Sequence, residues 1–205
     1  MSLDGKTRIL EAARTVIGRN GIAGATVRVI AEEAGLSTGA IYHYYKSKEE
    51  ILYDIMDYNL SESTKIAEES KKGLTPKERI LDKILENVKK RFDMEEESRI
   101  KFYLAQEAMV GNEELGIKFK RKYEEWIGGT EELLLYLYGN PTLESDKVRV
   151  KAIASLLIAG IDGTVTQLLL NANVTKKEDT IELYCDIMRK ALPTFFDTLS
   201  KDIKK

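Results

Sequence analysis

The segment from Thr26 to Lys48 constrains the fold more than any other part of this chain, because it predicts two short helices joined by a tight turn. Thr26 can cap the first helix, since its hydroxyl accepts from the backbone N–H groups that a helix start leaves free. Gly35 stands where helices commonly end with positive φ, which glycine tolerates best. Ser37 or Thr38 can cap the second helix. This is the geometry of a helix-turn-helix, whose second helix lies in the DNA major groove.

The second helix of this segment has one face for the core and one for solvent. Ile41 and Tyr45 are four residues apart, so they share a face that we expect to turn inward. The Tyr45 hydroxyl must then reach solvent or a partner, because an unpaired buried hydroxyl costs about 1–3 kcal/mol. Tyr42, His43 and the Thr38–Gly39 corner are left on the outside, as the candidate surface for reading DNA.

The stretch AGLSTGAIYHYYKSKEEIL resembles the signature of the TetR family of bacterial transcriptional repressors. In that family a Gly-hydrophobic turn leads to a Gly-x-hydrophobic-Tyr recognition helix and then to Lys-x-Lys-(Glu/Asp)-x-Leu. The resemblance is specific over roughly Lys6 to Leu52. The rest of the chain matches only in size, helical character and a few local features. One departure is Tyr45, where the family usually has Phe.

The resemblance implies that Thr26, Tyr44 and Lys48 hold the DNA backbone, and that the outer face of the second helix approaches bases or nearby phosphates. The residues themselves support phosphate binding, because Lys46 and Lys48 flank a helix start, where free N–H groups and the helix dipole favour anions. The alternative is a helix face of solvated polar side chains. The predicted DNA-contacting residues are Thr26, Arg28, Ser37, Thr38, Gly39, Tyr42, His43, Tyr44, Lys46 and Lys48.

The composition is that of an ordinary soluble globular protein, with 43% hydrophobic and 32% charged residues among 205. The net charge is −2, but the segment up to Lys48 holds seven basic and four acidic residues, which suits an end that meets a polyanion. The one cysteine, Cys185, allows no intrachain disulfide and fits a reducing cytoplasm. With one histidine and no CxxC or HExxH spacing, we expect no metal site and no cofactor. Because the first residues are polar and charged, we expect no signal peptide.

The whole chain predicts an all-α fold of about nine helices, with no period-2 alternation long enough for a strand. We expect a three-helix helix-turn-helix DNA-binding domain over 1–47 and a helical effector-binding and dimerisation domain over 48–205. The first helix is expected from Leu3 to Asn20. A helix from Ser47 to about Ser70 follows, and others are predicted over 96–110, 113–138 and 145–171.

Three capping boxes mark helix starts, at Ser47-x-x-Glu50, Thr75-x-x-Glu78 with Pro76 at the first helical position, and Thr175-x-x-Glu178. Pro193 is expected to kink or end the last helix. The most apolar run, Ala152 to Leu170, contains Asp162 and Gln167. A mid-span Asp is expensive in lipid, so we expect a buried core helix there and no membrane span.

The family resemblance implies a cavity in the C-terminal body that binds a small, usually lipophilic effector. Polar groups that converge in an apolar cavity are what such a site needs. The alternative is that these side chains belong to the core or to solvated faces, as is usual for Tyr and Trp at helical spacing. The candidate pocket residues are Tyr103, Gln106, Glu107, Tyr123, Trp126 and Asp162.

Small residues recur at spacings of three and four in the helix expected over 145–171, and such a stripe lets another helix approach closely. It could also pack within one chain. The family pattern implies that the last two long helices pair with their twins as a four-helix bundle, because a two-headed reader of DNA requires a C2 dimer. The candidate interface residues are Ala152, Ser155, Ala159, Gly163, Thr166, Tyr184 and Met188.

These features together predict a homodimeric, ligand-responsive regulator, expected to be a repressor, that binds a pseudo-palindromic double-stranded DNA operator and is released by a small lipophilic effector. An enzyme lacks support, because no nucleophile–base set and no Gly-rich phosphate loop is present. Two alternatives stay open: a helical protein-interaction module, and a regulator that its ligand activates.

Overall fold

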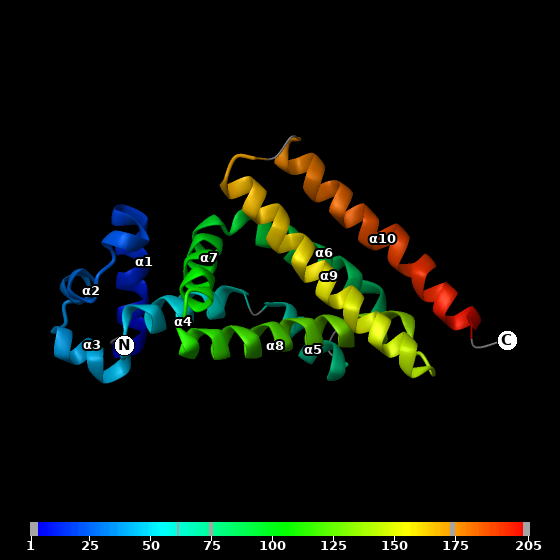
Figure 1. The fold of residues 1–205 in the computed structure, drawn as a ribbon, viewed down its shortest axis with the longest axis horizontal. Helices are drawn as coiled ribbons and strands as arrows, with labels where there is room; N and C mark the ends of the chain where they lie inside the picture. Colours follow the sequence, from blue (N-terminus) through cyan, green and yellow to red (C-terminus); the bar gives the residue numbers. More distant parts are fainter. Residues whose placement is uncertain (1–3, 61, 74–75, 173–174, 203–205) are drawn as a thin grey trace. The chain divides into compact units, whose positions relative to one another are not determined.

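The computed structural model describes residues 4–60, 62–73, 76–172 and 175–202, and over these residues it is all-helical, with ten helices and no strand (Figure 1). The predicted all-α fold is therefore confirmed, with one helix more than expected. The helices are α1 Gly5–Gly24, α2 Val27–Ala34, α3 Thr38–Tyr44, α4 Lys48–Leu60, α5 Glu62–Lys71, α6 Lys77–Asp93, α7 Glu95–Met109, α8 Glu113–Tyr138, α9 Glu144–Leu169 and α10 Lys177–Asp202.

The contacts divide the chain into two compact units. The first unit comprises Met1–Leu60 and Glu96–Ile117, and the second comprises Ser61–Glu95 and Lys118–Lys205. The first unit therefore holds α4 and most of α7 together with the helix-turn-helix. The functional boundary expected at residue 47 stays a prediction.

The first unit is built on α1, α2 and α3, which bury Ile9, Ile30 and Ile41 with no exposed surface. The expected break at Asn20-Gly21 is present as a kink: Gly21 has φ 70° and ψ 173°, and the helix resumes as far as Gly24. The expected start at Leu3 lies outside the described residues. Thus the helical spacing located the core correctly, and α1 ends at Gly24, a few residues beyond the expected end at Asn20.

The helix expected from Ser47 to about Ser70 is described as α4 and α5, on either side of residue 61, which lies outside the described residues. The capping box at its start forms in part. The Ser47 Oγ accepts from the Glu50 N–H at 3.3 Å, as predicted. The Glu50 carboxylate accepts from the Lys46 N–H at 2.6 Å, one residue before the expected donor.

The other two boxes differ from expectation. Pro76 is the N-cap of α6, so the helix starts at Lys77, and Thr75 lies outside the described residues. The helix α10 begins at Lys177, and the Thr175 hydroxyl lies 2.7 Å from that of Thr180. Pro193 lies inside α10, which continues to Asp202, so of the two expected outcomes the helix does not end there.

The second unit packs α5, α6, α8, α9 and α10 around an aliphatic core, and α6 contacts both α9 and α10. One part of this core joins Ile66, Ala67, Ile80 and Leu133. By length and composition α9 is the one helix of the described part that could cross a membrane, and 22% of its most apolar window is buried. It is thus less buried than the core helix expected there.

Candidate DNA-binding surface and ligand cavity

The two helices of the helix-turn-helix are capped as the sequence predicts. The Thr26 Oγ1 accepts from the Val29 N–H at 3.3 Å at the start of α2. Gly35 ends α2 with φ 62° and ψ 39°, in the left-handed region. At the start of α3 the structure selects Ser37 over Thr38, because the Ser37 Oγ accepts from the Ala40 N–H at 3.1 Å. The local sequence therefore fixes where α3 begins.

The predicted outer face of α3 is exposed. Tyr42 is 57% exposed, whereas Ile41 and Tyr45 on the opposite face are 0% and 4% exposed. His43, Thr38 and Gly39 are exposed as well. A Cβ at Gly39 would meet nothing nearer than the Ser37 Oγ, at 3.8 Å, so the surface there is open. This face is available for a duplex to approach.

Tyr44 has a second role in the first unit. It is 45% exposed, its ring meets that of His43 edge to face with centroids 5.3 Å apart, and it lies over Gly5. A Cβ at Gly5 would fall 2.6 Å from the Tyr44 hydroxyl oxygen, so a side chain at that position would push Tyr44 aside. The start of α1 thus helps to position Tyr44.

The predicted phosphate-binding cations differ in how freely they can reach a ligand. Arg28 is 82% exposed and pairs with Glu32 one turn along α2, with Nε and Oε1 3.1 Å apart. Lys46 is exposed. Lys48 is half-buried: its Nζ donates to the Ile22 carbonyl at 3.0 Å and lies 5.2 Å from the centre of the Tyr103 ring. An ammonium has three N–H donors, so Lys48 keeps others for a phosphate.

Two supporting contacts join residues that no sequence pattern pairs. Arg8 in α1 donates from Nη2 to the Ala34 carbonyl at 2.6 Å and so satisfies an end of α2. The Tyr45 hydroxyl, at the end of α3, donates to the Asp54 Oδ2 at 3.0 Å, and Lys6 pairs with the same oxygen at 2.8 Å. Burial and Asp54 raise the pKa of the Tyr45 phenol. The partner that the sequence required for this hydroxyl is therefore Asp54.

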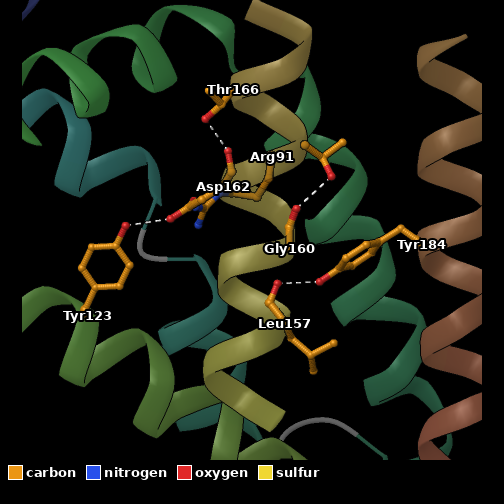
Figure 2. A network of polar contacts seen from close by, with 8 residues as sticks. Arg91, Tyr123, Leu157, Gly160, Asp162, Thr166 and Tyr184 are labelled. Carbon is orange, nitrogen blue, oxygen red and sulfur yellow. Dashed lines mark hydrogen bonds and ion pairs between the residues drawn. The ribbon is translucent and has the colours of Figure 1, made fainter. Parts of the chain in front are cut away.

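The second unit brings three of the predicted pocket residues together and adds a fourth. Figure 2 shows Tyr123 of α8 and Arg91 of α6 on either side of Asp162 of α9. The Tyr123 hydroxyl donates to the Asp162 Oδ2 at 2.7 Å, and the Arg91 Nη2 lies 4.0 Å from Oδ1. Trp126 completes the group: its ring centre lies 5.5 Å from the Arg91 guanidinium carbon and 5.3 Å from the centre of the Tyr123 ring.

These side chains are largely buried, and burial shifts the pKa values of Arg91 and Tyr123. Arg91 has a side chain only 8% exposed, against 18% for Asp162. Burial lowers the pKa of Arg91, and Asp162 opposes that shift. Burial, followed by Asp162, raises the pKa of Tyr123. Arginine nevertheless stays protonated in proteins, so a permanent cation is held inside this unit.

Arg91 also borders a cavity of about 50 Å³ between the helices of the second unit. Its walls are mostly aliphatic, with Asn87, Thr130, Tyr184 and Arg91 as the polar members. Tyr103, Gln106 and Glu107 are not among its lining residues; they lie on α7, where Tyr103 faces Lys48. The apolar lining residues are Ile66, Ile84, Val88, Leu133, Leu134, Leu157, Ile158, Ile161 and Met188.

The predicted interface stripe lies on the surface of α9. Ala152, Ser155, Ala159 and Gly163 are exposed, and Thr166 is half-buried. Large apolar side chains are exposed on the same two helices: Val148 and Leu156 of α9 are 64% and 69% exposed, and Leu183 and Ile187 of α10 are 62% and 52% exposed.

The other two predicted interface residues, Tyr184 and Met188, point inward. Tyr184 donates from its hydroxyl to the Leu157 carbonyl at 2.6 Å and lies so close to Gly160 that a Cβ there would fall 3.1 Å from its ring (Figure 2). Met188 is 4% exposed and lines the cavity. On α10 the outward apolar positions are therefore Leu183 and Ile187.

Comparison with known proteins agrees with this geometry. The model of the family described as "Bacterial regulatory proteins, tetR family" matches residues 9–55, which span the helix-turn-helix. The HTH-type transcriptional regulator PksA of Bacillus subtilis (strain 168) is 30% identical over 171 residues, covering 81% of this chain and 79% of that protein.

Solved structures support the fold of the whole chain. A TetR transcription regulator from Haloarcula marismortui superposes with a TM-score of 0.68 at 18% identity, covering 94% of this chain and 96% of the other. A putative transcriptional regulator from Saccharomonospora viridis, in complex with choline, gives 0.67 at 18% identity, covering 90% and 95%. This chain belongs to the tetR family of bacterial regulatory proteins and is a DNA-binding transcription regulator.

Proposed function

We propose that this regulator is a cytoplasmic homodimeric repressor that binds a pseudo-palindromic operator and is released by a small lipophilic molecule. Each protomer inserts α3 into one of two successive major grooves. The ligand favours a state in which the two heads are wrongly spaced. By linkage, DNA then weakens ligand binding by the same factor, typically worth about 1–3 kcal/mol.

The exposed face of α3 is the observation that carries the proposal. Tyr42 offers a large exposed ring that can stack on a base or contact a thymine methyl group, and His43 can bond a base edge or a phosphate. Exposed aromatic side chains on a short helix cost solubility, so a partner that covers them explains their presence. Arg28 and Lys46 are exposed and lie near α3 in the sequence, and they supply positive charge that can bind the DNA backbone.

The outward face of α9 and α10 supports a dimer. Small residues at Ala152, Ser155, Ala159 and Gly163 let a second helix approach closely, and the exposed Leu156 can add apolar contact area. A second copy packed on this face would bury the apolar surface that leaves α9 so exposed in one protomer. A C2 dimer presents the same face from both copies, as the two half-sites of an operator require.

The test is the salt dependence of DNA binding, using a duplex selected by the protein from a random library. If Arg28, Lys46 and Lys48 each neutralise one phosphate per protomer, the plot of log affinity against log salt has a slope of about −5. Lys46→Ala reduces the magnitude of the slope by about 2, because both protomers lose one contact. Lys120→Ala, on an exposed lysine of the second unit, is the matched control and leaves the slope unchanged. A slope near zero contradicts the assigned phosphate contacts.

A further inference from the structure

Lys48 is held at the start of α4 by contacts from two other helices of the first unit. Its Nζ donates to the carbonyl of Ile22, near the end of α1, at 3.0 Å. The same Nζ lies over the ring of Tyr103 in α7, 5.2 Å from the ring centre. A cation within about 6 Å of a ring centre is attracted by the negative face of the ring. The two contacts together restrict where this ammonium can point.

An unrestrained lysine loses rotamer freedom when it binds a phosphate, because its four-carbon stem is flexible. Ordering such a side chain weakens binding, and a side chain that is already held in place avoids that loss. Lys48 is the first residue of α4, where free backbone N–H groups also attract a phosphate. Holding its ammonium at this point therefore favours a phosphate contact.

An aromatic ring suits this task better than a carboxylate does. Arg28 pairs with the Glu32 carboxylate, which opposes its charge. The ring of Tyr103 holds the Lys48 ammonium without cancelling its charge, which a phosphate needs. Burial, followed by nearby glutamates of α4 and α7, raises the pKa of the Tyr103 phenol, so the side chain is neutral near pH 7 and acts through its ring.

We propose that Tyr103 is a positioning residue for DNA binding, because its ring holds the Lys48 ammonium in place for a backbone phosphate. This inference rests on the phosphate contact of Lys48 in the proposed function, and it adds a residue of α7 that acts through that contact. Tyr103 was expected to line the effector cavity. The cavity belongs to the second unit, whereas Tyr103 and Lys48 belong to the first.

Operator binding by the intact protein, measured at several salt concentrations with the selected duplex, tests this role. Tyr103→Leu removes the ring and keeps apolar bulk. We expect about tenfold weaker binding, because both protomers must then order Lys48 when they bind DNA. The plot of log affinity against log salt should keep the slope of the parent protein, because the charge of Lys48 remains. Tyr103→Phe keeps the ring face and should bind as tightly as the parent.

A double-variant cycle separates positioning from a general structural role. Lys48→Ala should reduce the magnitude of the slope by about 2, and adding Tyr103→Leu to it should change the affinity by less than about twofold. Phe102→Leu is the matched control and should leave operator affinity unchanged. Phe102 is also half-buried on α7, and its ring centre lies 6.0 Å from the Lys101 Nζ. Circular dichroism checks that each variant is folded.

Three results would overturn the inference. In the first, Tyr103→Leu binds the operator as tightly as the parent. In the second, Tyr103→Leu weakens binding by the same factor whether or not Lys48 is present, which indicates a structural effect alone. In the third, Tyr103→Phe binds as weakly as Tyr103→Leu, so that the ring is not the cause.

The proposed function is judged separately by the same measurements. If Lys48→Ala weakens binding and lowers the slope while Tyr103→Leu changes neither, the phosphate contact stands and only the role of Tyr103 fails. If Lys48→Ala changes neither affinity nor slope, the phosphate contact of Lys48 fails and the inference fails with it. If the parent protein binds no selected duplex, the proposed repressor fails.

Discussion

Tyr45 stands where the family usually has Phe, and replacing it with Phe should cost little, because its hydroxyl is one of two groups on the same acceptor. Asp54 Oδ2 accepts from the Tyr45 hydroxyl at 3.0 Å and pairs with the Lys6 Nζ at 2.8 Å. Tyr45→Phe removes one hydrogen bond and leaves Asp54 paired with Lys6. We expect a loss of about 1 kcal/mol in the free energy of unfolding.

Removing the acceptor, Asp54, is expected to cost more than removing the Tyr45 hydroxyl. Asp54→Ala leaves the hydroxyl of a residue only 4% exposed without its acceptor, at about 1–3 kcal/mol. In the Asp54→Ala background, Tyr45→Phe should then be neutral or stabilising, because it removes the unsatisfied group. This sign reversal is the signature of a coupled pair.

Urea unfolding followed by circular dichroism at fixed protomer concentration measures the cycle. Trp126 belongs to the second unit, so its fluorescence transition serves as an internal control. Burial and Asp54 raise the pKa of Tyr45 above its usual 10.0, so the unfolded chain loses this proton first and stability falls as the pH rises above about 10. Tyr45→Phe should lack that loss. Equal costs of Tyr45→Phe in both backgrounds would refute the coupling.

Three further changes test other parts of the structure. Ser37→Ala removes the cap of α3 and should lower stability by about 1 kcal/mol in the same urea assay; no change would contradict the cap. Leu156→Glu places a charge on the outward face of α9 and should shift light scattering towards the monomer, whereas Ile117→Glu, at a site 64% exposed on α8, should not. Gly160→Val should lower stability, measured by thermal unfolding, because a side chain there meets the ring of Tyr184, whose Cε2 would lie 3.1 Å from the added Cβ.

Local sequence patterns predicted the elements whose cause is local. The helix predicted over 113–138 matches α8, Glu113–Tyr138, at both ends, and Gly111 and Gly139 before and after it both have positive φ. The spacing of Ile41 and Tyr45 correctly predicted that one face of α3 is buried and that Tyr42 is exposed. These results follow because capping, glycine conformation and amphipathic spacing act within a few residues.

Local sequence patterns could not predict contacts between residues far apart in the chain. The sequence pointed to Tyr123, Trp126 and Asp162, and gave no sign of Arg91, which reads as one of several cations in the last turn of α6. Arg8 likewise reaches the Ala34 carbonyl across 26 positions. Tyr103 was expected at the pocket as one of the polar groups that could converge in the cavity implied by the resemblance. Its contact with Lys48 became visible only in the folded first unit. Helical periodicity does not show which helices pack against one another.

The most direct test of the account compares two exposed tyrosines in operator binding. Tyr42 is 57% exposed on α3 and Tyr136 is 41% exposed on α8. With the selected duplex at fixed salt, Tyr42→Ala is expected to weaken binding by about tenfold or more, since contacts to a base are worth about 1–3 kcal/mol, while Tyr136→Ala leaves affinity unchanged. Equal affinities for the two variants and the parent protein would contradict the claim that α3 reads DNA.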